Sequence, residues 1–175
     1  MRLVLALALS AGITVIAWAD VASGPKEGEK VPALKIFAVT GDPKDKEIDY
    51  AELRKDKPTI YLFVSAENFS RPMFRYIKML DEKVGDDALV VAVWLNDAPE
   101  KSKEYLPKIS KYFTNAALAV FGEKAGPKDW GINADAHLTA VVVHNGKVVK
   151  SFGYMSLNET DAPQVIEALK QAIKK

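Results

Sequence analysis

Three uninterrupted apolar runs stand out in the middle of the chain: Thr59–Val64, Ala88–Leu95 and Ala117–Phe121. Runs of this length without polar alternation are typical of strands that are buried on both faces of a sheet. Segments with helical spacing of apolar residues separate them, over residues 70–80 and 101–113. Strands separated by helices need parallel crossover connections. The pattern therefore predicts an α/β protein with parallel strands at its centre.

The C-terminal part of the chain predicts a hairpin and a last helix. Apolar segments over residues 138–144 and 147–152 flank Asn145-Gly146, and Asn-Gly is the strongest short hairpin signal. A helix with an apolar stripe follows over residues 162–174. Because a hairpin adds antiparallel strands to the parallel centre, we predict a three-layer α/β/α sandwich with a mixed central sheet.

Two weaker elements precede the first apolar run. Residues 31–39 predict a strand that lies partly at an edge, since Pro32 is tolerated at the start of a strand. Residues 47–54 predict either a short helical turn or a step from strand into helix. A charged turn that contains Gly41 and Pro43 separates the two.

The first residues have the three parts of a secretory signal peptide. Arg2 supplies a positive charge, residues 3–18 are almost wholly apolar, and Ala17 and Ala19 flank Trp18 in the small-x-small pattern that signal peptidase cleaves. We expect cleavage after Ala19 and export to the periplasm or secretion, with a bacterial envelope as the setting. An uncleaved membrane anchor is the alternative, although the run is short for a bilayer of about 30 Å.

The composition restricts the possible chemistry of the protein more than it restricts the possible folds. The sequence has 175 residues, a net charge of +1 and no cysteine. It therefore offers no disulfide, no thiolate metal ligand and no thiol nucleophile. Without a basic excess we expect no nucleic-acid partner. Residues 20–30, rich in Gly, Lys and Glu, predict a flexible leader, and residues 31–175 predict the folded domain, with no membrane span once the signal is cleaved.

Four short segments carry a family resemblance: residues 50–63, residues 64–67 (Val-Ser-Ala-Glu), residues 129–132 (Asp-Trp-Gly-Ile) and residues 145–149 with Gly153. In this order and spacing the chain resembles the thioredoxin-like, or redoxin, superfamily. The second segment is similar to the Phe-Trp-Ala-Glu that precedes Cys-x-x-Cys in many thioredoxins. The third is similar to the stretch before the family's cis-proline, and the fourth to its closing hairpin. The resemblance, from about residue 31 onward, implies a thioredoxin-like fold.

The chain departs from that family at its chemical centre. The turn that carries Cys-x-x-Cys in the family corresponds to Phe69, Ser70, Arg71 and Pro72, and the cis-proline position falls on Leu138. A residue other than proline costs about 2.5–4 kcal/mol to hold in cis, so we expect a trans bond before Leu138. The resemblance thus implies a divergent member without thiol–disulfide exchange or thiol peroxidase activity, because both need a thiolate.

The same turn is the candidate binding site. Free N–H groups at a helix N-terminus attract anions, Arg71 would add a forked donor, and the resemblance places His137 and Thr139 across the groove. The expected groove comprises Glu67, Asn68, Phe69, Ser70, Arg71, Pro72, His137, Leu138 and Thr139. A structural alternative makes Arg71 an exposed side chain, Ser70 a helix cap and His137 a loop residue.

Catalytic chemistry has little other support in the sequence. Asp135 and His137 do not complete a closed metal site, and there is no Gly-x-Ser-x-Gly elbow, so we expect no metal, no cofactor and no catalytic residue. We predict an exported, non-catalytic binding module whose partner is an unknown protein or peptide. The alternatives are a cysteine-independent enzyme that uses His137 with Ser70 or Arg71, and a structural subunit of an envelope complex.

Overall fold

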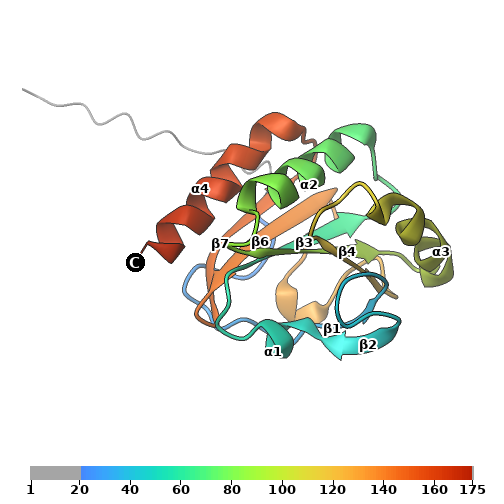
Figure 1. Ribbon diagram of the computed structural model, residues 1–175, viewed down its shortest axis with the longest axis horizontal. Helices are drawn as coiled ribbons and strands as arrows, with labels where there is room; N and C mark the ends of the chain where they lie inside the picture. The colour runs from blue at the N-terminus through green and yellow to red at the C-terminus, as the bar shows by residue number, and fades with distance from the viewer. Residues whose placement is uncertain (1–20, 175) are drawn as a thin grey trace, which may run out of the picture.

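The computed structural model describes residues 21–174, which form a sheet with helices on both faces (Figure 1). The strands are β1 (Lys35–Ala38), β2 (Lys46–Asp49), β3 (Thr59–Ser65), β4 (Leu89–Leu95), β5 (Ala117–Phe121), β6 (Leu138–His144) and β7 (Lys147–Tyr154). The helices are α1 (Tyr50–Arg54), α2 (Arg71–Val84), α3 (Pro99–Ser110) and α4 (Ala162–Ile173), with the 3-10 turns η1 (Lys128–Trp130) and η2 (Glu159–Asp161). The predicted signal peptide at residues 1–19 lies outside the described residues. Within residues 21–174, none of the helices is both long and apolar enough to cross a bilayer.

The sheet is mixed, as predicted, with the strand order β2-β1-β5-β4-β3-β6-β7. Its centre is parallel, because α2 and α3 return the chain to the same end of the sheet before β4 and β5 begin. The other neighbouring pairs are antiparallel. Asn145 and Gly146 have φ angles of 51° and 67°, which suit a two-residue hairpin turn between β6 and β7.

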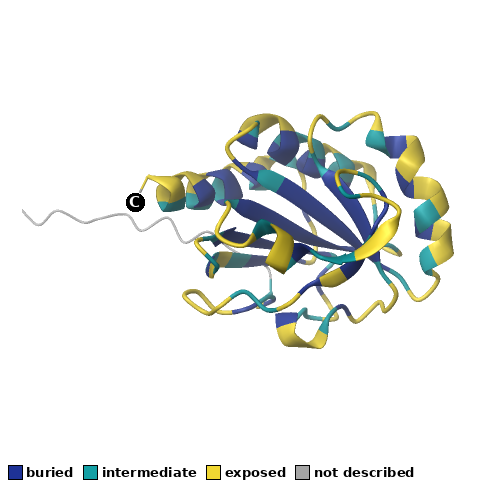
Figure 2. Cartoon of the chain, turned by 60° about the horizontal axis from the view of Figure 1, so that its bottom comes forward, coloured by how far each residue is buried: buried dark blue, intermediate teal, exposed yellow. Residues whose placement is uncertain are grey.

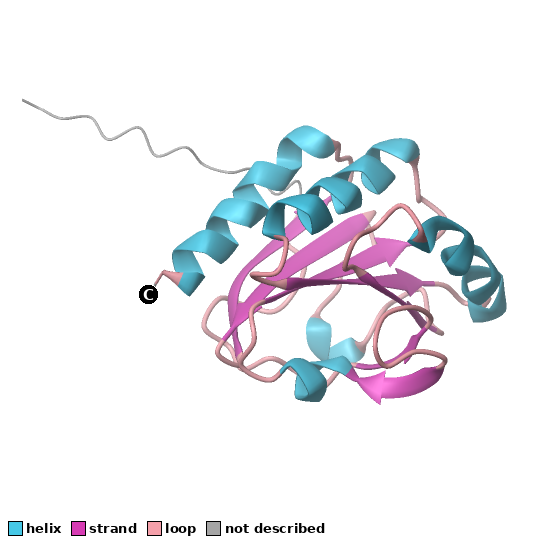
Figure 3. Ribbon diagram, in the orientation of Figure 1, coloured by secondary structure: helices cyan, strands magenta, loops and turns pink. Residues whose placement is uncertain are grey.

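Two cores lie on the two faces of the sheet, which confirms the predicted three-layer α/β/α sandwich. Helices α2, α3 and α4 cover one face, and α1 with η1 lies against the other (Figure 3). The residues of β3 alternate between the two cores. Leu62 and Val64 pack toward α2 and α4, whereas Tyr61 and Phe63 pack toward η1. The central strands are buried along their length, as the unbroken apolar runs predicted (Figure 2).

Trp130 covers the face of the sheet that carries only α1 and η1. Its ring centroid lies 5.2 Å from that of Tyr61 and 4.9 Å from that of Phe63. Its indole Nε1–H donates to the carbonyl of Ala33 at 3.0 Å, so the polar edge of the buried ring has a partner. The indole therefore fixes both η1 and the chain before β1 against the central strand.

A buried carboxylate joins α2 to the loop before β5. Asp81 is only 1% exposed, and its two oxygens accept the backbone N–H groups of Thr114 at 2.5 Å and Asn115 at 3.1 Å. A buried charge is tolerated when hydrogen bonds replace its hydration. The side chain thus stabilises the return of the chain from α3 into the sheet.

Residues 21–30 correct our expectation of a flexible leader, because they lie along the outer edge of β7. Val21 and Gly153 form a β-bridge, and the N–H of Gly28 donates to the carbonyl of Val148 at 2.8 Å. The composition of this segment could not reveal the arrangement, since backbone groups at the edge of β7 supply these contacts. We refer to residues 21–30 as the N-terminal strap.

The step predicted over residues 47–54 is confirmed as β2 running directly into α1. Asp49 ends the strand and caps the helix, because its Oδ1 accepts the N–H of Glu52 at 3.1 Å and that of Leu34 at 3.0 Å. The helix predicted over residues 101–113 is α3, which begins at Pro99 and ends at Ser110. The strand predicted over residues 31–39 is shorter, at Lys35–Ala38.

The strap depends on the absence of a side chain at Gly153. A Cβ there would lie 2.3 Å from the carbonyl oxygen of Val21 and 2.7 Å from Cβ of Ser23. We expect Gly153→Ala to lower the free energy of unfolding by about 1–3 kcal/mol, as overpacking does, in urea unfolding. Gly122→Ala is the control, because its nearest contact would be 3.9 Å away. Equal losses in the two variants would contradict the close packing.

Buried tyrosines make the fold sensitive to high pH. Burial raises the pKa of Tyr76 well above 10.0, and neighbouring Tyr154 raises it further. The unfolded chain therefore loses this proton first, so the stabilisation is complete below the unfolded pKa and is lost as pH rises beyond it. We expect the free energy of unfolding to fall above about pH 10, and Tyr76→Phe to make the fall less steep. Urea unfolding across alkaline pH measures both, with exposed Tyr112→Phe as the control. A slope that Tyr76→Phe leaves unchanged would count against this assignment.

Candidate functional site

The predicted site residues gather where the parallel strands end. β3, β4 and β5 point to one edge of the sheet, and β6 begins at the same edge, because Val64 pairs with Leu138 in antiparallel register. We call this the C-terminal edge, made by residues 65–70, 96–98, 122–124 and 135–137. Open α/β sheets bind ligands outside the carboxyl ends of their strands. The edge is therefore the first place to look for a binding site.

Backbone hydrogen bonds join the turn after β3 to the start of β6. The N–H of Ser65 donates to the carbonyl of His137 at 2.9 Å, and the N–H of His137 donates to that of Tyr154 at 2.8 Å. Asn68 folds back over the turn, where its Nδ2 donates to Oγ of Ser65 at 2.9 Å. Residues 67–71 and His137 thus share one edge.

The start of α2 is only partly the cap that Ser70 suggested. Ser70 is the N-cap residue, with an extended backbone at φ −138° and ψ 167°, but its side chain makes no capping hydrogen bond. Pro72 lies in the first turn, where its missing N–H costs nothing. Arg71 is exposed, and within residues 21–174 no ion pair involves it.

Phe69 is the member of the predicted set with the most extensive contacts. Its ring lies across that of Trp94, with centroids 5.1 Å apart, and near that of Tyr105 at 6.2 Å. These aromatic side chains line a surface hollow of about 270 Å³ between the start of α2 and the first turns of α3, together with Ala66, Asn96, Lys101 and Ser102. We call it the aromatic hollow.

Sequence reasoning missed most of this hollow. Trp94 belongs to the apolar run at residues 88–95, which predicted a buried strand, and it is 2% exposed. Tyr105 of α3 is 41% exposed. The signal was present in Phe69, an aromatic residue in a turn, but its partners could not be identified before the order of β3 and β4 was known.

Polar groups lie beside the rings. Asn96 directly follows β4. Its Nδ2 donates to Oγ of the buried Ser102 at 3.0 Å, and its Oδ1 accepts the N–H of Ala98 at 2.9 Å. Lys101 is exposed, and no carboxylate pairs with it in the part of the chain that the structure describes. The hollow therefore combines apolar walls with a fixed amide and one cation.

Two of the predicted groove residues cannot line a surface. Leu138 and Thr139 are both fully buried, and they project to opposite faces of β6. The hydroxyl of Thr139 lies 2.6 Å from that of Ser23, which also accepts the N–H of Asn133 at 2.9 Å. The bond before Leu138 is trans, as expected, because the one cis bond among the described residues precedes Pro43.

The side chains that the enzyme alternative requires are not hydrogen-bonded to one another at this edge. Among the described residues no hydrogen bond links the side chain of His137 to Ser70 or Arg71, and no cluster of three metal-ligating side chains occurs. The tyrosines whose pKa burial raises, Tyr50, Tyr61 and Tyr76, belong to the two cores. The edge presents aromatic, amide and charged contact groups.

No protein-family model matches the chain, and no curated protein matches it either. Solved structures do match. A protein proposed to be a disulfide isomerase from Bacteroides thetaiotaomicron has a TM-score of 0.64 and 14% identity, over 89% of this chain and 96% of that one. A peroxiredoxin-like protein from Aquifex aeolicus has a TM-score of 0.57 and 16% identity, over 87% and 90%.

A third match is the exposed lipoprotein thioredoxin of Streptococcus pneumoniae, with a TM-score of 0.55 and 15% identity over 78% of this chain and 98% of that one. At such identities the likeness shows the fold alone. The chain therefore has the thioredoxin-like fold that the four segments implied. It has this fold without a cysteine at any position of the sequence.

Proposed function

We propose that this thioredoxin-like domain is exported, has no thiol redox activity, and binds an extended protein or peptide segment at its C-terminal edge. The observation that carries the proposal is the position of Phe69. In the turn where the resemblance places the first cysteine, the chain has a half-buried phenylalanine that packs on Trp94 and Tyr105. The turn thus supplies an apolar contact in place of a nucleophile.

Disulfide exchange and thiol-dependent peroxide reduction both require a thiolate at the reacting centre. This sequence contains none. Hydroxyl and imidazole groups at the edge do not replace it, since neither can form and release a mixed disulfide. The names of the similar structures describe thiol chemistry, and the shared fold is what we carry over from them.

The aromatic hollow suits one side chain of a bound segment. Buried aromatic rings supply much of the binding energy in protein interfaces, and Tyr and Trp are enriched among the residues that dominate it. Around the hollow, Glu67, Arg71 and Lys101 are exposed, so both signs of charge are available to a polar backbone and its side chains. Asn96 offers a fixed amide at the rim.

Export rests on residues 1–19, with one positive charge, an apolar run and small residues around Trp18. A protein with a similar fold is named as an exposed lipoprotein thioredoxin of Streptococcus pneumoniae. This chain has no cysteine to carry a lipid at the cleavage site, so we propose a free mature chain that starts at Asp20.

Panning a phage-displayed peptide library against the exported chain tests the proposal. The chain is expressed with residues 1–19 in a bacterial host, and its intact mass should match a start at Asp20. We expect enriched peptides that share an aromatic or aliphatic anchor. The Phe69→Ala/Tyr105→Ala double variant should bind them at least about tenfold more weakly, because anchors of this kind dominate interfaces.

Tyr112→Ala is the matched control, because Tyr112 is also an exposed tyrosine near α3, at 51% exposure, but does not line the hollow. It should bind the enriched peptides as the unchanged protein does. Circular dichroism should show that each variant keeps its fold. Failure to enrich any peptide, or equal binding by the double variant, would reject the edge as a peptide site. Co-purification in a stable complex that masks the edge would favour the structural-subunit alternative.

A further inference from the structure

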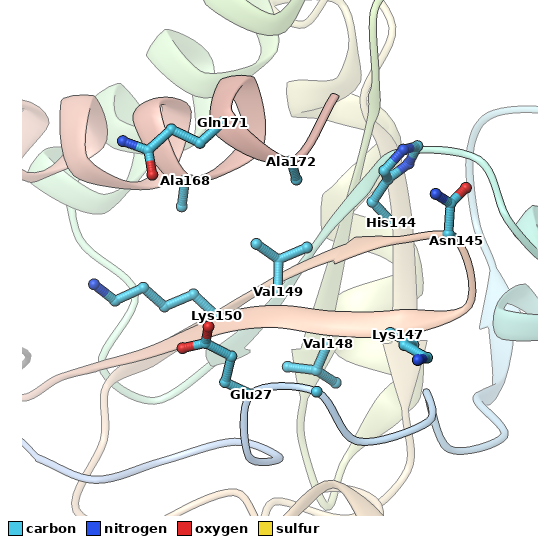
Figure 4. A pocket seen from close by; sticks show the side chains of 11 residues that line it. Glu27, His144, Asn145, Lys147, Val148, Val149, Lys150, Ala168, Gln171 and Ala172 are labelled. Carbon is cyan, nitrogen blue, oxygen red and sulfur yellow. The ribbon is translucent and has the colours of Figure 1, made fainter. Parts of the chain in front are cut away.

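A second and larger hollow lies at the opposite end of β6, away from the C-terminal edge. It encloses about 470 Å³ between the β6–β7 hairpin, the last turns of α4 and the N-terminal strap (Figure 4). Pockets for small molecules usually have volumes of this order, with apolar walls and a few placed polar groups. We call it the hairpin hollow.

A β-bulge shapes the floor of the hollow. Val143 pairs with Val148 and Val142 pairs with Lys150, so Val149 is an extra residue in β7. A bulge bends its strand and changes the direction in which the following side chain points. Lys150 consequently pairs with a residue of the core under α4, and its Nζ lies 5.1 Å from the centroid of the Phe152 ring.

Small side chains leave the space open. Ala168 and Ala172 lie one turn apart on α4 and face Val149 across the hollow (Figure 4). Gly28 of the strap adds no side chain on the other side of β7. The walls are therefore largely apolar at the points where α4 and β7 come closest.

The charge around this hollow is mostly positive. His144 and Lys147 are cross-strand partners, and Lys150 follows the bulge. In the described part of the chain, neither Lys147 nor Lys150 forms an ion pair with a carboxylate. Glu27 is the one acidic residue among those that line the hollow, and it lies on the side of Lys150, whereas Lys147 lies at the hairpin end (Figure 4).

His144 supplies an additional unsatisfied group. Its Nδ1 is buried and has no hydrogen-bond partner among the described residues. A buried polar atom without a hydrogen-bond partner is unfavourable. A polar group of a ligand, or a rotation of the ring toward one, would satisfy it.

We propose that the hairpin hollow binds a small organic monoanion: a carboxylate or sulfonate attached to an apolar body. The ammonium group of Lys150 holds the anionic group, and the apolar body packs against Val149, Ala168 and Ala172 (Figure 4). Inorganic anions lack the apolar part, and neutral apolar molecules lack the charge. The proposal is independent of peptide binding at the C-terminal edge, because the two sites share no residue.

Titration of the ¹⁵N-labelled chain with sodium 1-naphthalenesulfonate tests the proposal by NMR. We expect saturable amide shifts at Gly28 and at residues 144–150. Sodium sulfate and neutral 1-naphthalenemethanol should each bind at least about tenfold more weakly, since each can use only one part of the hollow. Lys147→Gln/Lys150→Gln should weaken binding of the sulfonate about three- to tenfold, the effect of losing the charge contact with Lys150 and the longer-range attraction of Lys147.

Lys108→Gln/Lys170→Gln is the matched control, because it removes the same charge from exposed positions on α3 and α4 that do not line the hollow. It should leave the affinity unchanged. Ala172→Leu should block the site, with thermal unfolding as the check that the fold is retained. Shifts centred elsewhere, equal affinity in the two double variants, or equal binding of all three probes would overturn the proposal.

Discussion

The arrangement of both hollows depends on one constraint: β3 is buried on both faces and paired on both edges. Its apolar residues supply both cores, and its neighbours are a parallel strand, β4, and an antiparallel strand, β6. A strand in this position can neither shift register nor expose a face without losing packing on both sides. The two ends of β3 are therefore fixed in position, and the segments before and after β3 lie beside those ends.

That constraint also explains which parts of the molecule could be predicted from the sequence. The unbroken run at residues 59–64 and the Asn145-Gly146 turn fix the centre and the hairpin of the sheet through local chemistry alone. The pairing of Phe69 with Trp94 and Tyr105 depends on which strand lies beside β3, and no local pattern carries that information. The same holds for Thr139, whose buried hydroxyl finds a partner in Ser23 from a segment that composition alone marked as a leader.

At the C-terminal edge, the turn before α2 makes packing contacts through Phe69. Helix α2 starts with Ser70 and Pro72, which suit a helix start, and Phe69 turns onto the end of β4 instead of facing a reaction partner. An aromatic ring in that turn stabilises the loop and at the same time offers part of its surface to solvent. Under the proposed function, the same side chain would supply both stability and recognition, whereas a reactive group would have to be kept accessible.

The strap has a consequence for the behaviour of the protein at high concentration. An unpaired edge strand can recruit the edge of another molecule and begin a polymer. The outer edge of β7 is bridged by the chain itself at Val21 and Lys30. The other outer strand, β2, is only four residues long, and its Lys46 and Glu47 are exposed. The N-terminal strap therefore covers the outer edge of β7, and the outer edge at β2 is short and charged. Edge-to-edge association of two molecules is disfavoured at both.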